Sequence, residues 1–518
     1  MKTKESTFVN RFRKYFKFDT YEAIFRKEII GGLSTFIAMA YILAVNPAMV
    51  SSANGAGENI EGGLFLSTAI SAFCATMFMG LYARIPVSLA PGMGLNAFFT
   101  YNIASQIGFN SALSVTILSG VLYFIVVMTP AREKISQIMP TNLKLAIGAS
   151  IGFFIAFLGL QDSQIIVKDV ALVSGLGNFT NPLVITALVL LFVALILHYS
   201  KIPGAIIITM LLGGIILLPM IATGFIKGVD PQSINPMHEG YKGFSSFPEV
   251  ASAAWKGFIS PEMWKNPITY IGALSFLYMD FFDTTGTLIS IDKTLNLTEK
   301  DPKWMSRANL VDAIGTIGGA SIGSTTVTAF VESTVGISAG ARTGVAAIFS
   351  GLLFGLSIAL WPVIQIFMPV DVINVVDGKT IIASYKPITG PILFLVGTMM
   401  ISQIKHFEWE IIIDIPTLFM TIMFMMLANS IAYGIAFGTI TFVILNASLG
   451  IFQYLFKKNK KIVNSMEIPT TIVSGTKIKT REFYYLKRIN IALIFISIIS
   501  IAYIILQQGI SHLDWFKS

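Results

Sequence analysis

The chain has 518 residues, of which 54% are hydrophobic and only 12% are charged. A soluble domain carries about 25% charged residues, so this composition excludes an ordinary soluble protein and predicts an integral membrane protein. The single cysteine excludes an intrachain disulfide, and the four histidines lie at the ends of apolar runs or in loops. We therefore expect no metal site and no cofactor.

Residues 1–28 are rich in Lys and Arg and lack the short apolar region and cleavage site of a signal peptide, so they predict a cytoplasmic basic tail. Beyond them, apolar runs of membrane-spanning length recur, and we predict an all-α polytopic membrane protein with fourteen spans, several of them short. The approximate limits of the spans are 30–50, 63–82, 91–106, 111–130, 143–160, 183–198, 202–224, 268–291, 307–320, 329–341, 343–368, 389–404, 411–428 and 429–456.

Lys and Arg are distributed unevenly between the two sides of this arrangement. With the tail inside, the inside loops carry Arg84, Lys201, Arg342 and a cluster at 457–461, whereas the loops after spans 1 and 3 carry none. Cytoplasmic loops of membrane proteins are enriched in these residues. The net charge of +8 is therefore an orientation signal, and we expect a multi-pass plasma-membrane protein with a cytoplasmic N-terminus and no nucleic-acid partner.

Three segments lie outside the predicted spans. Residues 226–267 form an extracellular loop that is long enough for local structure, and residues 457–488 form a cytoplasmic basic segment. The apolar run 489–506 has the length of an extra C-terminal span, with an interfacial helix as the alternative. We favour the span.

Fourteen spans divide into two sets of seven, and a copy of an odd-numbered unit must insert the opposite way up, which is a 7+7 inverted repeat. Spans 3 and 10, the third of each set, are both interrupted by Gly or Pro: Pro86–Phe99 in one, Gly323–Glu332 in the other. Glycine and β-branched residues after Gly323 disfavour a helix and favour a short extended piece. Paired interrupted segments predict a binding site near the middle of the membrane.

Glu332 is the candidate residue for recognition of the substrate. It lies ten residues before Arg342, the expected cytoplasmic end of its helix, which places it roughly 15 Å inside the membrane. An ionisable residue at that depth indicates function.

Span 8 contributes a second set of polar residues, because Asp280, Asp283, Thr284 and Thr287 fall on one helical face. Asp312 of span 9 adds another acid, although a structural hydrogen bond is the alternative role for it. No Lys or Arg lies deep in a span to neutralise these acids, which favours protonated acids at rest and a proton-coupled carrier.

Four motifs occur in a fixed order. They are Gly32–Pro47 in span 1, Ala90–Phe99 in span 3, Asp280–Leu288 in span 8, and Gly323–Ser333 with Gly340–Gly344 in span 10. These motifs resemble those of the nucleobase–cation symporters, the uracil/xanthine/purine permeases, and above all their AzgA-like branch, which carries hypoxanthine, guanine or adenine. The chain departs from that branch at Met426–Gly434, which has neither the usual proline nor the Asp before the glycine.

The resemblance implies a fold and a site. The fold has a core domain of residues 29–130 and 268–368, a gate domain of 131–225 and 369–456, and short strands before broken helices 3 and 10. It also implies dimers through the gate and a bacterial plasma membrane. The implied substrate-binding residues are Glu332, Asp280, Asp283, Gly94, Asn96, Thr328 and Phe98, with Thr284, Thr287 and Asp312 in proton coupling or support of the site. A register error of one turn would exchange the roles of Asp280 and Asp283.

The sequence therefore predicts proton-coupled uptake of purine nucleobases, hypoxanthine or guanine and then adenine, by an alternating-access carrier embedded in the lipid bilayer. The nearest rival is a carrier of another solute on the same fold, such as xanthine, uracil or an anion, and sodium could replace the proton. A membrane-embedded enzyme would need a nucleophile and base or a metal set. A channel would show much lower selectivity.

Overall fold

The computed structural model describes most of the chain, and the described residues fall into two compact units. One unit comprises Met1–Thr129 with Leu158–Leu395, and the other comprises Pro130–Phe157 with Val396–Ser518. The described residues are 7–57, 59–129, 140–167, 174–202, 204–226, 241–376, 379–428, 430–455, 471–473 and 476–478, with a few positions between 493 and 504. The predicted span 489–506 lies almost entirely outside them.

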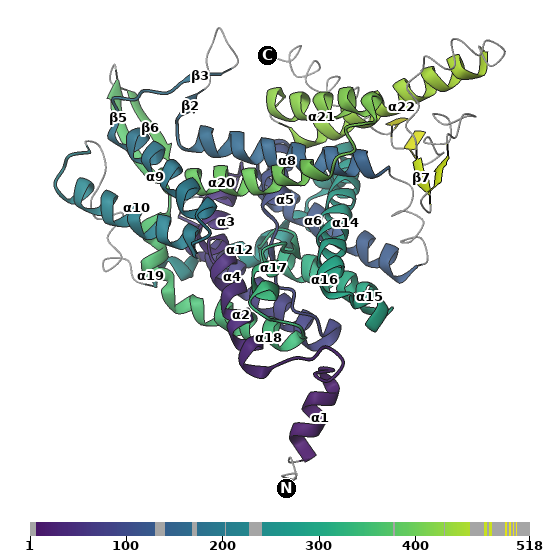
Figure 1. Ribbon diagram of the computed structural model, residues 1–518. Coiled ribbons are helices and arrows are strands. Elements are labelled where there is room, and N and C mark those ends of the chain that lie inside the picture. Colours follow the sequence, from purple (N-terminus) through teal and green to yellow (C-terminus); the bar gives the residue numbers. More distant parts are fainter. Residues whose placement is uncertain are drawn as a thin grey trace. The chain divides into compact units, whose positions relative to one another are not determined.

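The first unit is largely helical (Figure 1). Its N-terminal part contains α1 (Thr7–Tyr15), α2 (Phe25–Met39), α3 (Ile42–Val50), α4 (Glu61–Phe78), a π-helical turn (Met79–Ala83), β1 (Leu89–Pro91), α5 (Met93–Ala97), a second π-helical stretch (Phe98–Ile103) and α6 (Ala104–Met128).

The rest of this unit follows the end of α8 (Thr141–Asp162). It contains β2 (Ile166–Val167), β3 (Gly175–Leu176), α9 (Pro182–Tyr199), α10 (Ala205–Ala222), α12 (Phe247–Ile259), α13 (Pro261–Lys265), α14 (Pro267–Leu295), α15 (Leu297–Lys300), α16 (Trp304–Ser321), β4 (Val327–Ala329), α17 (Ser333–Ser338), α18 (Gly344–Leu356), α19 (Trp361–Ile364), β5 (Val370–Val376), β6 (Lys379–Tyr385) and the start of α20 (Thr389–Ile401). Short 3-10 turns lie between several of these elements.

The second unit contains the first part of α8, the end of α20, α21 (Ile415–Leu427), α22 (Ile431–Leu455), β7 (Thr471–Val473) and β8 (Thr476–Ile478). α21 and α22 form an antiparallel helical pair. Gly434 and Gly438 of α22 face Met425 and Thr421 of α21, because small residues let membrane helices approach closely.

Eight helical stretches of the described chain are long and apolar enough to cross a membrane, which confirms a multi-pass membrane protein. They are Phe25–Val50, Glu61–Ala83, Met93–Met128, Thr141–Asp162, Pro182–Tyr199, Ala205–Ala222, Gly344–Phe367 and Tyr433–Phe452. The stretch Met93–Met128 covers most of predicted spans 3 and 4. Gly108, with φ of 78°, breaks the helix between the two, in a backbone conformation that glycine adopts readily.

One predicted segment differs from the structure, and another contains the local structure that its length allowed. Span 10 was expected over 329–341, but its helical part is only α17, which ends before Gly340, where φ is 109°. Part of the predicted extracellular loop is a helix, α12, which packs against α4, α6 and α16. α12 is amphipathic, and its apolar residues Val250, Ala253 and Ala254 are buried in these contacts.

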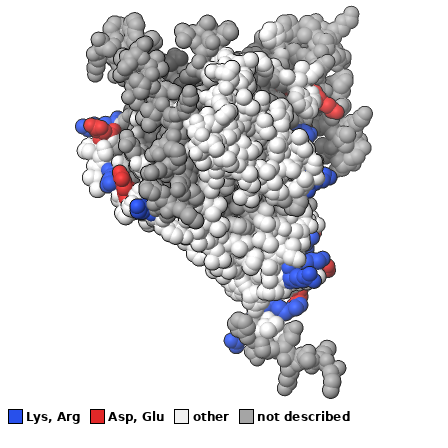
Figure 2. All heavy atoms as spheres, turned by 90° about the vertical axis from the view of Figure 1, so that its left-hand side faces the viewer, with Lys and Arg blue, Asp and Glu red and all other residues white. Residues whose placement is uncertain are grey.

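The surface agrees with a lipid environment. Figure 2 shows one face whose described residues are almost all uncharged, with Lys and Arg at the margins. On α9, Phe192 and Ile196 are 55% and 64% exposed, and Ile215 of α10 is 67% exposed. Large apolar side chains that face outward in this number are expected where lipid replaces water.

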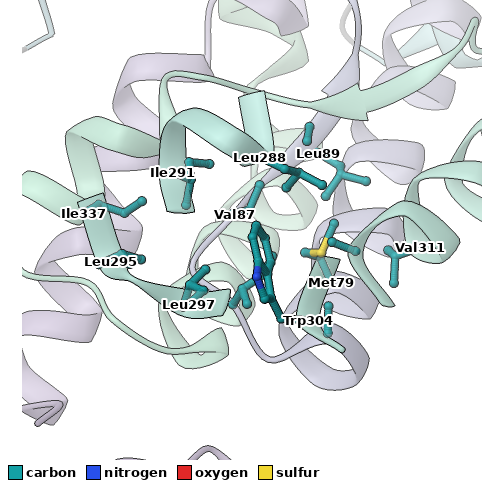
Figure 3. Packing of buried hydrophobic residues seen from close by; sticks show 14 of the residues in the cluster. Met79, Val87, Leu89, Leu288, Ile291, Leu295, Leu297, Trp304, Val311 and Ile337 are labelled. Carbon is teal, nitrogen blue, oxygen red and sulfur yellow. The ribbon is translucent and has the colours of Figure 1, made fainter. Parts of the chain in front are cut away.

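A hydrophobic cluster connects β1 and β4 with the ends of α14 and α16. Figure 3 shows the Trp304 ring below Val87, between Leu297 and Met79, and the indole is completely buried. Leu89 of β1 and Val327 of β4 belong to the same cluster. The strands are therefore fixed to a packed core in addition to their pairing with each other.

Candidate functional site

Two short strands pair in the first unit, each ahead of an interrupted helix, as the sequence predicted. β1 and β4 are antiparallel, and every strand residue is buried. The pairs are Leu89 with Ala329, Ala90 with Thr328 and Pro91 with Val327, and the pairing is extended by backbone hydrogen bonds from Gly92 to Thr326 and from Phe330 to Ser88. This pairing satisfies extended backbone that lipid could not.

One threonine hydroxyl holds each strand on the side away from its partner. Thr76 of α4 donates to the Leu89 carbonyl at 2.8 Å and accepts from the Leu89 amide at 2.9 Å. Thr316 of α16 makes the same two bonds with Val327, at 3.0 and 3.2 Å. Antiparallel pairs alternate between hydrogen-bonded and non-hydrogen-bonded residues, so the free groups of Leu89 and Val327 point toward these helices. We call these two contacts the threonine clamps.

Buried carboxylates of α14 and α16 reach β4 through hydroxyl groups. Thr316 also lies 3.1 Å from Asp280 Oδ2. Thr284 donates to Asp312 Oδ2 at 2.6 Å, and its oxygen lies 2.6 Å from that of Thr328. Asp280, Thr284 and Asp312 are completely buried. The predicted polar face of α14 therefore contacts α16 and the second strand.

Asp283 and Thr287 occupy the same face of α14 with fewer contacts. Asp283 is partly exposed, whereas Thr287 is buried. Asp283 lies close enough to Asp280 and to Glu332 to interact with both electrostatically, so the three acids lie in one neighbourhood.

Glu332 lies three residues beyond β4, at the position that precedes the first residue of α17. Its Oε1 accepts a hydrogen bond from the Tyr41 hydroxyl at 3.1 Å. Glu332 is 7% exposed and Tyr41 is 1% exposed. This hydrogen bond from the Tyr41 hydroxyl holds the Glu332 carboxylate in one orientation.

Asn96 of α5 belongs to an amide and hydroxyl network between the two halves of the chain. It donates to Asn46 at 2.5 Å, and Asn46 donates to Thr68 at 2.8 Å. The Thr325 hydroxyl, just before β4, donates to Asn96 Oδ1. The side chain of Asn96 therefore connects the first broken helix to the approach of the second strand.

Gly94 and Phe98 belong to the first broken helix. Phe98 is buried and contacts Phe276 of α14, with ring centroids 4.9 Å apart and an interplanar angle of 72°. This edge-to-face geometry is favourable for aromatic pairs. Gly94 is half-buried within α5. Phe98 in this structure packs on α14.

The sequence reasoning missed three residues of this region: Tyr41, Asn46 and Thr316. Tyr41 and Asn46 lie in the span 1 motif, and polar groups in so apolar a run were a usable signal. Thr316 gave no such signal, because a threonine in a membrane helix usually bonds the carbonyl one turn earlier in its own helix.

A separate charged cluster lies away from these acids. Lys386, just before α20, forms a salt bridge with Asp162 at 3.2 Å and donates to Ser52 at 3.1 Å. Its side chain is only 7% exposed. This pair is not attached to Glu332 or to the acids of α14 and α16.

Solved structures of transporters share this fold. The transmembrane domain of the cyanobacterial bicarbonate transporter BicA aligns with a TM-score of 0.54 over 79% of this chain and 96% of that domain, at 15% identity. SLC26A9 aligns with a TM-score of 0.54 over 84% of this chain and 67% of that protein, at 12% identity. At these identities the likeness concerns the fold alone.

Sequence relatives are permeases. A putative permease, MJ0326, of Methanocaldococcus jannaschii is 35% identical over 84% of this chain and 93% of its own length. The guanine/hypoxanthine permease PbuO of Bacillus subtilis is 32% identical over 82% and 92%, and the adenine permease AdeQ of Escherichia coli is 27% identical over 84% and 91%. These relatives confirm the expectation of a transporter rather than an enzyme. The model of the Permease family matches residues 26–373, and the chain belongs to this family of nucleobase permeases, as its motifs predicted.

Proposed function

We propose that this protein takes up purine nucleobases, guanine and hypoxanthine first and adenine second, across the plasma membrane together with protons. The main observation behind this proposal is that Glu332, the acids of α14 and the two paired strands converge on one buried polar region. Relatives named guanine/hypoxanthine and adenine permeases support the purine class.

The chemistry of the site fits a purine. A purine base is planar and presents ring N–H groups, and guanine and adenine add an exocyclic amine, all of which donate hydrogen bonds. Carboxylates only accept them. Glu332 and one of Asp280 and Asp283 therefore bind these donors, while Thr328 and Asn96 pair with ring acceptors. Buried polar groups reject an analogue that leaves them unpaired, often by orders of magnitude.

Protons suit the charge balance of this region. Asp280, Asp312 and Glu332 are buried, and each hydrogen-bonds a hydroxyl. None of the salt bridges in the described part of the chain involves them. Several unpaired carboxylates cannot all remain charged in a dry site. Binding of a proton by one of them would couple the proton gradient to uptake.

Transport itself would follow from relative movement of two domains. We assign the core to 29–130 and 268–368 and the gate to 131–225 and 369–456, with the gate as the surface of a homodimer. The two threonine clamps support an inverted repeat, because the second helix of each half of seven spans makes the same contact with the strand that follows it. In such folds one domain rocks against the other around a fixed site.

An anion carrier is the rival that the solved structures raise, since one of them transports bicarbonate. Glu332, at the start of the second broken helix, and the acids of α14 disfavour an anionic substrate by direct repulsion. The geometry therefore favours a neutral base.

A ligand-binding experiment tests the substrate class. We expect guanine, hypoxanthine and adenine to raise the thermal unfolding midpoint of the purified protein, because a ligand at about one hundred times its Kd stabilises the folded state by about 2.7 kcal/mol. Xanthine, uracil and bicarbonate are the comparison ligands. The Glu332→Gln variant should keep its unliganded midpoint and lose the purine shift. A shift produced by uracil or bicarbonate and by no purine would contradict the proposal.

A further inference from the structure

The hydroxyl of Thr316 has two acceptors within reach and one hydrogen to give. Asp280 Oδ2 lies at 3.1 Å and the Val327 carbonyl at 3.0 Å, while the Val327 amide donates to the same hydroxyl at 3.2 Å. A threonine hydroxyl donates one hydrogen bond and accepts two. Thr316 is completely buried, so its contacts are with protein groups.

The clamp in the other half of the chain lacks this competition. Thr76 is completely buried as well, and its hydrogen bonds run to the carbonyl and the amide of Leu89. No acid of the described chain hydrogen-bonds to Thr76. The same strand contact therefore occurs once with a carboxylate attached and once without.

We propose that Thr316 is a positioning residue that couples the protonation of Asp280 to the hold on β4, an inference that rests on the proposed nucleobase transport. When Asp280 is a carboxylate, the Thr316 hydrogen turns to Oδ2, since bonds to charged acceptors are the stronger ones. The Val327 carbonyl then loses its donor. When Asp280 binds a proton from water, its O–H donates to the Thr316 oxygen and the Thr316 hydrogen returns to Val327.

The Thr316 hydroxyl and both backbone groups of Val327 are all hydrogen-bonded in the protonated state alone. There the Thr316 oxygen accepts from Asp280 and from the Val327 amide, and its hydrogen holds the Val327 carbonyl. In the ionised state one buried carbonyl is unpaired, which costs free energy. Protonation of Asp280 therefore holds the strand in place.

Other titratable groups face this region, and none of them shares a hydroxyl with the backbone of β4. They are Asp283 on α14, Asp312 on α16, Glu332 after β4, Tyr123 on α6, and Tyr41 in the turn before α3, which hydrogen-bonds to Glu332. Asp312 reaches the Thr328 side chain of β4 through Thr284, whereas Asp280 reaches the backbone of β4 through Thr316.

The consequence for transport is a substrate affinity that depends on pH through the strand. β4 carries Thr328 and leads directly into Glu332, so a loosened Val327 moves two proposed ligands of the base. We expect the KM for guanine to be about fivefold higher at pH 8 than at pH 6, the effect of one neutral hydrogen bond.

Three variants of the full-length carrier test this coupling by initial rates of radiolabelled guanine uptake at pH 6 and pH 8. Thr316→Val removes the contacts of the hydroxyl with Asp280 and with both backbone groups of Val327, so we expect a raised KM whose ratio between the two pH values falls to about one. Thr316→Ser keeps the hydroxyl and should restore the wild-type ratio. Thr76→Val removes the matching clamp, so KM should rise while the wild-type ratio is kept.

The opposite results are distinguishable from failure of the proposed function. A Thr316→Val variant that transports guanine with the wild-type ratio overturns the coupling and leaves the transport proposal intact. A wild-type KM that is equal at pH 6 and pH 8 has the same meaning, and so does a Thr76→Val variant that loses the ratio equally. Absence of guanine uptake by the wild type would instead contradict the proposed function itself.

Discussion

Tyr41 is the group through which the fold orients Glu332, and its removal leaves the carboxylate in place without its donor. We expect Tyr41→Phe to raise the KM for guanine about tenfold, because a hydrogen bond to a charged group contributes about 1.5–3 kcal/mol. Glu332→Gln should abolish measurable uptake. Tyr270→Phe is the control, since the Tyr270 hydroxyl bonds the Trp264 carbonyl on an exposed surface. Wild-type kinetics in Tyr41→Phe would show that the contact has no role in binding.

At the residue scale the sequence identified the acids but not their partners. Glu332 and Asp280 stood out because ionisable residues in apolar spans are rare. Tyr41, in the turn between α2 and α3 and almost three hundred residues away in the chain, meets Glu332 only after folding. A threonine bond to a distant strand, such as that of Thr316, leaves no local pattern in the sequence.

Asp301, between α15 and α16, connects the N-terminal tail to α16, because it forms salt bridges with Lys17, at 2.8 Å, and with Arg307. Burial alone would raise the pKa of Asp301, but hydrogen bonds from Lys17 and Arg307 outweigh burial and hold the pKa below its ordinary value. A depressed folded-state pKa means that the ion pairs stabilise the fold above the unfolded pKa of about 3.9. This contribution is lost as the pH falls through the folded value.

We therefore expect Asp301→Asn to lower the thermal midpoint by a few degrees at pH 7, with a difference that narrows below about pH 4. Thermal unfolding in detergent at several pH values measures it. Asp19→Asn is the matched control, because the Arg13–Asp19 pair is 41% and 78% exposed and such pairs contribute little. An equal loss in both variants at every pH would refute the role given to Asp301.

At the scale of elements, the interruption of both half-helices was readable from glycine, proline and β-branched residues. The length of the second one was not. α17 covers only Ser333–Ser338, because the chain turns at Gly340, and the hydropathy of 329–341 does not mark that turn. The contact of α12 with α4, α6 and α16 was also unpredictable, since it depends on how distant helices pack.

Gly92, directly after β1, lies so close to β4 that there is no room for a side chain. A Cβ added there would lie 2.6 Å from the Thr328 side chain, on the opposite strand. We expect Gly92→Ala to reduce uptake by at least tenfold, because β4 must shift to relieve the overlap. Gly318→Ala, where an added Cβ meets nothing within 4 Å, should transport normally. Normal uptake by Gly92→Ala at wild-type protein levels would contradict this packing.

At the scale of the whole molecule, the two compact units and the proposed core and gate agree at one boundary and differ elsewhere. The unit boundary at 129/130 lies next to the proposed boundary at 130/131, whereas the other two unit boundaries fall inside α8 and α20. The proposed core and gate follow from the resemblance of the motifs to a family, whereas the compact units follow from the packing of residues in one conformation. Residues Asp162 and Lys386, which we assign to the gate, therefore share a unit with Ser52 of the core.

The Lys386–Asp162 pair has a predictable energetic signature. Burial favours a neutral lysine, but the Asp162 carboxylate outweighs burial and raises the pKa of Lys386 above its ordinary value. The stabilisation by the pair therefore persists throughout the neutral range and is lost only as the pH rises through the raised pKa. Lys386→Met leaves a carboxylate unpaired and should destabilise by about 3–5 kcal/mol. The double variant Lys386→Met/Asp162→Leu should recover most of this loss, measured by thermal unfolding. Additive losses would show that the two side chains do not form a buried pair.

Uptake of radiolabelled guanine and hypoxanthine tests the central claim most directly. Bacterial cells that lack their own purine permeases should gain saturable uptake of both bases when they express this protein. Adenine should compete, and collapse of the proton gradient should abolish accumulation in wild-type cells. Cells that express the intact protein in their membrane and take up neither base above the level of Glu332→Gln cells would contradict the account.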